Sequence, residues 1–233
     1  MGSSDLGHVV LTGGVGAIGA ATAQRLLTLG YRVTILDVAK NGDIEDSLER
    51  LGHAGQVAYI GADVRDRGSV DDALASAFPF DVVIGIAGIG QTARFVNVTA
   101  DEWQRHLDIN LTGNFNVAQS AVRLLLGHSR PGRLIFVSSW VGERAWPESS
   151  AYAVSKAGLN MLARCIALET ARQGITVNVV APGILNAGLS NEEALRNPDY
   201  ATRIKKAIPL GRLQTVEDVA NVLTFMSSPE ARP

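Results

Sequence analysis

The order of its apolar segments constrains the fold of this 233-residue chain more than any other feature. Short apolar runs with little polar alternation indicate strands buried on both faces. They cover residues 8–12, 32–36, 56–61, 81–86, 133–137 and 175–180. Amphipathic stretches between and after them predict helices at residues 17–29, 43–51, 69–77, 99–126, 150–172 and 215–227. This alternation predicts an α/β fold, a Rossmann-like doubly wound parallel sheet with helices on both faces.

Capping residues support several of the predicted helix starts. Ser69 is a residue type that caps helix N-termini, so we expect it to begin the helix of residues 69–77. Thr99 with Glu102, and Thr215 with Asp218, have the three-residue spacing of a capping box.

The chain shows no repeat, low-complexity tract or linker, so we expect residues 1–233 to form a single dinucleotide-binding and catalytic domain. Residues 1–7 are expected to be disordered. Residues 185–207 form a long polar segment that suits a substrate lid, with a surface insertion as the alternative.

Composition excludes several classes of partner. Lys plus Arg number 21 against 23 Asp plus Glu, and this balance favours neither nucleic acid nor an anionic membrane. No apolar run reaches the ~18 residues of a membrane span, and the N-terminus lacks a signal-peptide core. The single cysteine, Cys165, is expected to be a buried thiol in a cytoplasmic protein. The histidines form no ligand-like cluster, so we expect no metal site. They are interpreted as strand, loop or helix-surface residues: His8, His53, His106 and His128.

A glycine-rich turn follows the first predicted strand and opens a helix. Gly14, Gly16 and Gly19 match the pattern G-x-G-x-x-G. Such glycines permit a tight turn and close backbone approach to a pyrophosphate, which rests on the helix N-terminus. The cofactor-binding residues expected here are Gly13, Gly16, Ile18 and Gly19.

Acidic residues after the next two strands suit the adenosine half of a dinucleotide. Asp37 ends the second strand, where a carboxylate accepts hydrogen bonds from ribose hydroxyls and repels a 2′-phosphate. Val38 follows, where a basic residue would suit NADP, so the sequence favours NAD. Asp63 and Val64 can flank the adenine, although helix capping or loop solvation by Asp63 explains its position equally well.

A further set of residues resembles the short-chain dehydrogenase/reductase family from Val9 to about Pro229. The motifs that carry this resemblance are Tyr152-x-x-x-Lys156, Ser138-Ser139, Asn110, Pro182-Gly183 and residues 208–212. The resemblance is to the NAD-dependent type, with likeness to the 3-oxoacyl reductases. It implies Asn110, Ser139, Tyr152 and Lys156 as catalytic residues. It also implies cofactor contacts from Ala87, Gly88, Tyr152, Lys156, Pro182, Gly183 and Ile184.

Physical chemistry supports this assignment. Tyr152 and Lys156 are four residues apart on a predicted helix and so share one face. A free tyrosine has a pKa of about 10, and a nearby ammonium lowers that pKa by stabilising the phenolate. Ser139 lies thirteen residues before Tyr152, the family's catalytic separation, and can donate to the substrate oxygen. The resemblance implies that Asn110 distorts its helix and holds a water in a proton relay.

The sequence departs from the family at several points. Ala17 stands where the family's glycine-rich turn has its middle glycine, and Gly85-Ile86 replace two asparagines. Ala187 occupies the place of a threonine that holds the carboxamide, so we expect backbone groups of Ile184 to do so. The family's C-terminal strand is missing, which is expected to leave an open sheet edge and indicates a truncated or incompletely represented chain.

The sequence therefore predicts an NAD(H)-dependent oxidoreductase that interconverts a secondary alcohol and a ketone. A 3-oxoacyl-thioester reductase and a non-catalytic NAD-binding protein are the alternatives. The resemblance implies a homo-oligomer, a dimer or tetramer, built on helices 99–126 and 150–172. Residues suited to packing within the subunit or between subunits are Val117, Ala121, Leu124 and Leu125. Candidate walls of the substrate pocket are Gln91, Arg94, Trp140, Glu143, Arg144 and Trp146, together with residues 185–207.

Overall fold

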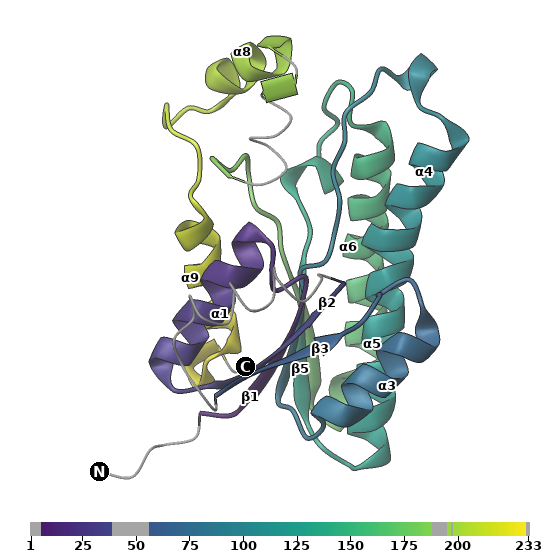
Figure 1. Cartoon of the computed structure of the whole chain (residues 1–233), viewed down its shortest axis with the longest axis vertical. Helices are drawn as coiled ribbons and strands as arrows, with labels where there is room; N and C mark the ends of the chain where they lie inside the picture. Colours follow the sequence, from purple (N-terminus) through teal and green to yellow (C-terminus); the bar gives the residue numbers. More distant parts are fainter. Residues whose placement is uncertain (1–5, 39–55, 188–194, 197, 232–233) are drawn as a thin grey trace.

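The computed structural model describes residues 6–38, 56–187, 195–196 and 198–231. Its sheet has six parallel strands in the order β3-β2-β1-β4-β5-β6 (Figure 1). Their bounds are β1 His8–Thr12, β2 Arg32–Asp37, β3 Val57–Gly61, β4 Val82–Gly85, β5 Gly132–Val137 and β6 Ile175–Val180. The predicted parallel sheet is confirmed, and its strand order reverses between β1 and β4. Ligands bind at this switch point in open α/β sheets.

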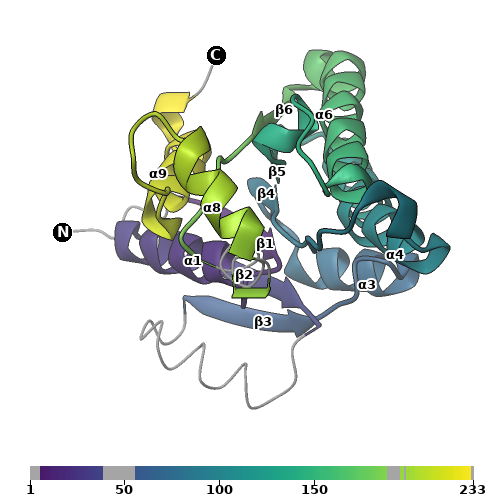
Figure 2. The same ribbon diagram turned by 90° about the horizontal axis from the view of Figure 1, so that it is seen from above.

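Helices cover both faces of the sheet, as predicted. They are α1 Ala17–Leu29, α3 Arg67–Ala77, α4 Ala100–His106, α5 Asn114–Gly127, α6 Ser150–Thr170, α8 Pro198–Ala207 and α9 Val216–Ser227. Figure 2 shows α1 and α9 on one side of the sheet and α3, α4 and α6 on the other. Helix α8 lies beyond the end of the sheet, away from the N-terminus (Figure 1).

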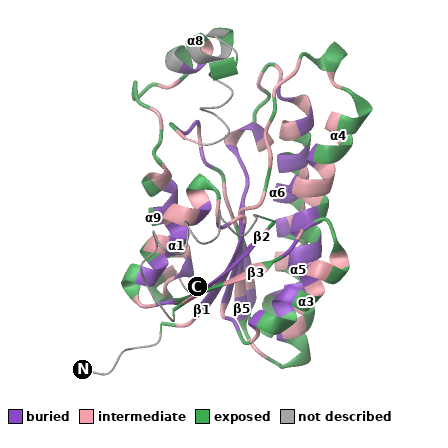
Figure 3. Ribbon diagram, viewed as in Figure 1, coloured by how far each residue is buried: buried purple, intermediate pink, exposed green. Residues whose placement is uncertain are grey.

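The core explains why the strands lack alternation. Val10 and Val83 pack toward α3, α5 and α6, whereas Val9 and Leu11 pack toward α1 and α9. These four side chains are at most 1% exposed. Figure 3 shows the buried residues gathered on the strands and on the inner sides of the flanking helices. Val117, Ala121 and Leu125 of α5 belong to the first of these layers, so they pack within the subunit.

The two predicted capping boxes are present at Thr99 and Thr215. The expected cap at Ser69 is wrong, because α3 begins two residues earlier. Asp66 caps it by accepting from the backbone N–H groups of Gly68 and Ser69. A carboxylate is a strong N-cap acceptor, and Ser69 Oγ instead accepts from the backbone N–H of Asp63 at 3.2 Å.

The predicted helix of residues 99–126 is divided in three. Helices α4 and α5 flank a π-helical segment, Leu107–Gly113, with Asn110 at its centre. Single π-helical turns inside longer helices are rare and often mark functional sites. The helix expected at residues 43–51 lies outside the described residues, as do residues 1–5 of the expected disordered N-terminus and residues 188–194 of the expected lid.

Two predictions about single side chains are wrong. Cys165 is exposed, because it lies on the face of α6 that turns away from the sheet, with Met161 and Leu168. His106, interpreted as a helix-surface residue, is only 2% exposed. Amphipathic spacing identifies an apolar face but not which neighbouring element covers it.

Candidate active site

A cavity of about 630 Å³ opens at the carboxyl ends of the strands, over the switch point between β1 and β4. All predicted cofactor residues line it, and so do Ser139, Tyr152 and Lys156. Of the expected substrate walls, Gln91, Trp140 and Trp146 line it. Arg94, Glu143 and Arg144 are exposed outside its lining. The structure adds Thr92, Arg105, Val141, Ser149 and Val216.

The glycine-rich turn has the shape that a pyrophosphate requires. Gly13 has a φ of 69°, and a Cβ there would lie 2.8 Å from backbone atoms of Ala87. Gly16 is the N-cap of α1, and no side chain caps that helix. The N–H groups of its first turn are therefore without a side-chain acceptor beside the cavity, where a phosphate can accept from them. These residues fit the phosphates of a dinucleotide.

Asp37 is fixed at the end of β2. Its Oδ2 accepts from the backbone N–H of Val15 at 3.0 Å, and its Oδ1 accepts from that of Val38 at 2.8 Å. The carboxylate thus joins β2 to the glycine-rich turn and faces the cavity. Each oxygen retains a lone pair, so Asp37 can also accept from ribose hydroxyls.

Asp63 is paired with Arg65 beside the cavity. Arg65 Nη2 lies 2.6 Å from Asp63 Oδ2, and Arg65 Nε donates to Oδ1 at 3.0 Å. The hydrogen bond from Arg65 holds the pKa of Asp63 below its usual value. Val64, which follows, is buried and lines the cavity. The structure places Asp63 on the cavity wall and adds Arg65, a cation that the sequence reasoning did not include.

The loop after β4 is held without the family's two asparagines. Thr12 Oγ1 accepts from the backbone N–H groups of Ile86 at 3.2 Å and Ala87 at 3.3 Å. At Gly85, a Cβ would collide with Oδ1 of Asn114, so an amide from α5 occupies this space instead. A Cβ at Gly88 would lie 3.1 Å from Asn110 Oδ1 and 3.5 Å from Lys156 Nζ. The loop therefore passes close to Asn110 and Lys156, two of the side chains expected to perform catalysis.

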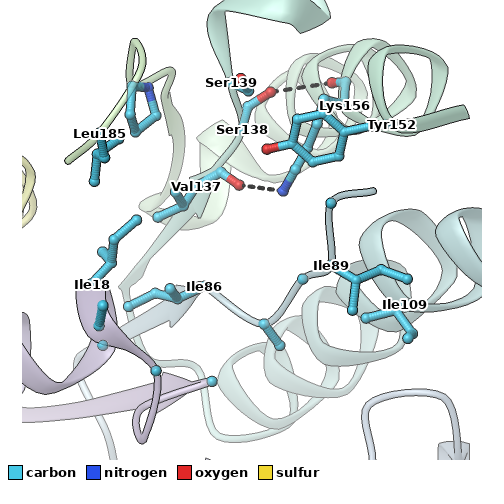
Figure 4. Close-up of a pocket in the computed structure, with 18 of the residues that line it drawn as sticks. Ile18, Ile86, Ile89, Ile109, Val137, Ser138, Ser139, Tyr152, Lys156 and Leu185 are labelled. Atoms are coloured by element: carbon cyan, nitrogen blue, oxygen red, sulfur yellow. Dashed lines mark hydrogen bonds between the residues drawn. The ribbon is translucent and has the colours of Figure 1, made fainter. Parts of the chain in front are cut away.

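Three of the side chains expected to perform catalysis, Ser139, Tyr152 and Lys156, surround one end of the cavity (Figure 4), whereas Asn110 lies outside its lining. Figure 4 shows the Tyr152 hydroxyl directed into that space. Lys156 Nζ lies 5.7 Å from the centre of the Tyr152 ring and donates to the Val137 carbonyl at 2.8 Å. Ser138 Oγ donates to the Lys156 carbonyl at 3.3 Å, whereas Ser139 hydrogen-bonds only within its own turn, accepting from Val141 N–H at 3.5 Å.

Lys156 is buried, at 3% exposed, and among the described residues no carboxylate forms a salt bridge with it. Burial lowers the pKa of Lys156 to about 8. A lysine with this pKa still holds its proton most of the time near neutrality. The site therefore contains a cation next to a phenol.

Asn110 is buried in the π-helical segment. Its Oδ1 accepts from the backbone N–H of Ile89 at 2.8 Å, and its Nδ2 donates to the Ile89 carbonyl at 2.9 Å and to Ser155 Oγ at 3.0 Å. The Asn110 carbonyl accepts from Asn114 Nδ2 at 2.8 Å. Asn110 thus ties the loop after β4 to the start of α6, and the helix distortion implied by the family resemblance is present.

A family model described as enoyl-(acyl carrier protein) reductase matches residues 14–233. The chain belongs to the short-chain dehydrogenase/reductase family. It is 34% identical over 228 residues to a 3beta-hydroxysteroid dehydrogenase of Eggerthella lenta, covering 96% of this chain and 87% of that protein. It is 31% identical to a 3-oxoacyl-[acyl-carrier-protein] reductase of Rickettsia conorii, covering 95% and 89%.

The solved structure of actinorhodin polyketide ketoreductase with NADPH has the same fold, with a TM-score of 0.90. The identity is 26%, and the match covers 99% of this chain and 94% of that one. The chain is therefore a nicotinamide-dependent oxidoreductase of the short-chain dehydrogenase/reductase family. The residues that the structure describes contain no group of acidic, histidine or cysteine side chains suited to a metal. They also contain no helix with the length and hydropathy of a membrane span.

Sequence reasoning also missed two residues that hold the loops of the site in place. Gln214 Oε1 accepts from the backbone N–H of Gly183 at 2.7 Å, and the Gln214 backbone N–H donates to the Ile184 carbonyl at 3.0 Å. Gln214 thus holds the segment expected to bind the carboxamide, where Ala187 replaces the family's threonine. The only sequence feature that could have pointed to Gln214 is its position directly before Thr215, the predicted helix cap. The second is His106, which contacts the loop after β4.

Proposed function

We propose that this member of the short-chain dehydrogenase/reductase family interconverts a secondary alcohol and a ketone with NAD(H). The observation that carries the proposal is the meeting of Tyr152, Lys156 and Ser139 at one end of a cavity whose other end holds the glycine-rich turn and Asp37. A phenol beside a buried ammonium is suited to proton transfer, which favours an enzyme over a non-catalytic NAD-binding protein.

The chain's own residues perform the proton chemistry. Lys156 stabilises the phenolate form of Tyr152, and this phenolate removes the hydroxyl proton of the alcohol as a general base. Ser139 donates a hydrogen bond to the substrate oxygen, where negative charge develops. Ser138 is less suited, because its hydroxyl is turned toward the backbone of α6. NAD, when bound, supplies the hydride acceptor. In ketone reduction Tyr152 returns the proton.

Support for NAD rather than NADP comes from Asp37. Its fixed carboxylate lies in the cavity and is followed by the exposed, uncharged Val38. A 2′-phosphate placed beside that carboxylate would be repelled. Arg65 also lines the cavity, and its charge is already paired with Asp63.

An apolar, ring-shaped substrate suits the end of the cavity that contains Ser139 and Tyr152. Trp140 and Trp146 lie edge to face with ring centres 5.1 Å apart, and both line the cavity. Ile184 and Ile204 pack against them from the segment after β6 and from α8. Rigid aromatic and aliphatic walls favour flat alicyclic ligands. The hydroxysteroid dehydrogenase among the relatives agrees with this substrate class.

A 3-oxoacyl-thioester reductase is the second candidate, favoured by the relative that carries this activity in its name. The test is a spectrophotometric screen at 340 nm. It uses NAD⁺ and NADP⁺ with cyclohexanol, 2-decalol and a 3-hydroxysteroid, and NADH and NADPH with acetoacetyl-CoA. We expect reduction of NAD⁺ by the ring alcohols and loss of that activity in Tyr152→Phe with NAD⁺ binding retained. Activity confined to acetoacetyl-CoA with NADPH would support the second candidate.

The outer face of α6 suits contact between subunits. Leu168 is 85% exposed and Met161 is 55% exposed on that face, which also carries Cys165. Exposed apolar residues gathered on one face favour an interface. We therefore propose that the protein is a homo-oligomer that uses this face, either a dimer or a tetramer.

A further inference from the structure

The loop after β4 borders the substrate side of the cavity through residues 88–92. Alternate backbone N–H groups of this loop are held from three different elements. Ile89 donates to Asn110 Oδ1 at 2.8 Å, Gln91 to His106 Nε2 at 3.2 Å and Ala93 to the Glu148 carbonyl at 2.9 Å. His106 accepts the middle of these three hydrogen bonds, from Gln91, which lines the substrate side of the cavity.

The hydrogen bonds of His106 define its protonation. The backbone N–H of Gln91 can only donate, so His106 Nε2 must accept. The ring proton is therefore on Nδ1, which lies 2.7 Å from the Glu102 carbonyl and donates to it. Only this neutral tautomer satisfies both contacts, because a proton on Nε2 would face the N–H of Gln91.

His106 also lies behind the proposed base. Its ring centre is 6.4 Å from that of Tyr152, with the rings 66° apart. His106 is 2% exposed, so its ring nitrogens cannot bond to bulk water and depend on these two hydrogen bonds within the protein. One side chain thus contacts both the substrate loop and the ring of the catalytic tyrosine.

We propose that His106 is a positioning residue that sets the substrate-side loop, through Nε2 acting as the acceptor for Gln91. Loss of this acceptor frees the loop between Ile89 and Ala93 and weakens substrate binding more than nucleotide binding. If His106 only filled space in the core, its ring volume would matter and its two ring nitrogens would not.

Four forms of the protein separate these roles. His106→Gln has an amide that reaches the place of Nε2, so it can accept from Gln91. His106→Asn is shorter and reaches only the place of Nδ1. His106→Phe keeps the ring and loses both nitrogens. We expect the Gln91 amide to exchange with deuterium at the wild-type rate, within about threefold, in His106→Gln and at least tenfold faster in the other two variants.

The tautomer is tested in the wild-type protein by ¹⁵N NMR of the histidine rings, with His106→Gln identifying the signal. We expect the proton on Nδ1. A proton on Nε2, or Gln91 exchange that is equally fast in the Gln and Phe variants, would overturn the proposal. The tautomer measurement remains decisive if His106→Phe does not fold.

The kinetic consequence rests on the proposed function and is measured with NAD⁺ and 2-decalol. We expect KM for the alcohol to rise roughly fivefold in His106→Asn, the scale of one neutral hydrogen bond, with KM for NAD⁺ unchanged and His106→Gln near wild type. Equal rises in both KM values would overturn a role on the substrate side. If 2-decalol is no substrate, the proposed substrate class fails, whereas exchange and tautomer still test His106.

Discussion

Lys156 illustrates a residue whose proposed role in catalysis comes at the expense of folding stability. Its ammonium is enclosed near the floor of the cavity and donates to a single backbone carbonyl, that of Val137. Burial of a charge is unfavourable, and this cost appears as a pKa lowered to about 8. The same desolvation strengthens the electrostatic effect of Lys156 on the phenol of Tyr152.

Replacing Lys156 with Met is therefore expected to stabilise the fold while abolishing activity. Below pH 8 the lysine is charged in both states, and the folded state carries a penalty of about 3.5 kcal/mol at most, from ~1.4 kcal/mol per pKa unit. The lost hydrogen bond offsets part of this, so we expect a gain of about 1–2 kcal/mol at pH 7 in urea unfolding.

The difference in stability between wild type and Lys156→Met is expected to depend on pH. As pH rises from 8 toward 10.5, the folded state loses the Lys156 proton before the unfolded state does. The unfolded state then binds more protons, so wild-type stability rises with pH and the advantage of Lys156→Met shrinks. A difference between the two proteins that stays constant from pH 7 to 10 would contradict this account.

Asp37 combines two roles that substitution can separate. Asp37→Asn removes the charge while its amide oxygen can still accept from Val15 N–H, whereas Asp37→Ala removes both. We expect the ratio of kcat/KM for NAD⁺ to that for NADP⁺ to fall about 100-fold in Asp37→Asn, within the ~4 kcal/mol of two unit charges 4 Å apart near a surface. Asp37→Ala should shift the ratio similarly and also weaken binding of both nucleotides. An unchanged ratio in Asp37→Asn would remove the argument for NAD.

At the scale of elements, α8 is attached to the rest of the site by an ion pair. Arg203 Nη2 lies 2.5 Å from Glu148 Oε2, and Ile204 packs on the tryptophan pair. Glu148 has a φ of 66°, unusual for a residue with a side chain, and its carbonyl holds the loop after β4. One short segment before α6 therefore positions both α8 and the loop.

Breaking this pair is expected to loosen α8 without disturbing the nucleotide end. In Arg203→Met we expect KM for 2-decalol to rise about threefold to tenfold, since a partly buried ion pair is worth about 1 kcal/mol. The dissociation constant of NADH, from fluorescence titration, should not change. The control is Arg212→Met, which removes the exposed pair with Asp218 and should leave both constants unchanged. A weaker affinity for NADH in Arg203→Met would contradict this assignment.

At the scale of the whole molecule, the outer face of α6 exposes apolar residues to solvent. The buried residues of α6 face the core, but its opposite face presents Met161, Cys165 and Leu168 to solvent. In a monomer these apolar side chains stay in contact with water, whereas an assembly through this face would bury them.

A charge on this face should dissociate the assembly. For Leu168→Glu we expect light scattering after gel filtration to show monomers at concentrations where the wild type is a dimer or tetramer. Leu29→Glu, on the helix that covers the opposite sheet face, is the matched control and should leave the mass unchanged, since Leu29 is also exposed, at 49%. A wild-type protein that is monomeric at all concentrations would disprove the interface.

By itself the sequence determined the parallel sheet, its flanking helices and the cofactor-binding candidates that line the cavity, because the carboxyl ends of parallel strands meet at one edge. The glycine-rich turn, Asp37 and the Tyr152–Lys156 pair follow from local spacing and chemistry. Only the tertiary structure decided that His106 is buried and Cys165 exposed, since one helical pattern is compatible with either neighbourhood. The contacts of Gln214 with Gly183 and of Asn114 with Gly85 join residues about 30 positions apart, and local periodicity carries no information on such pairs.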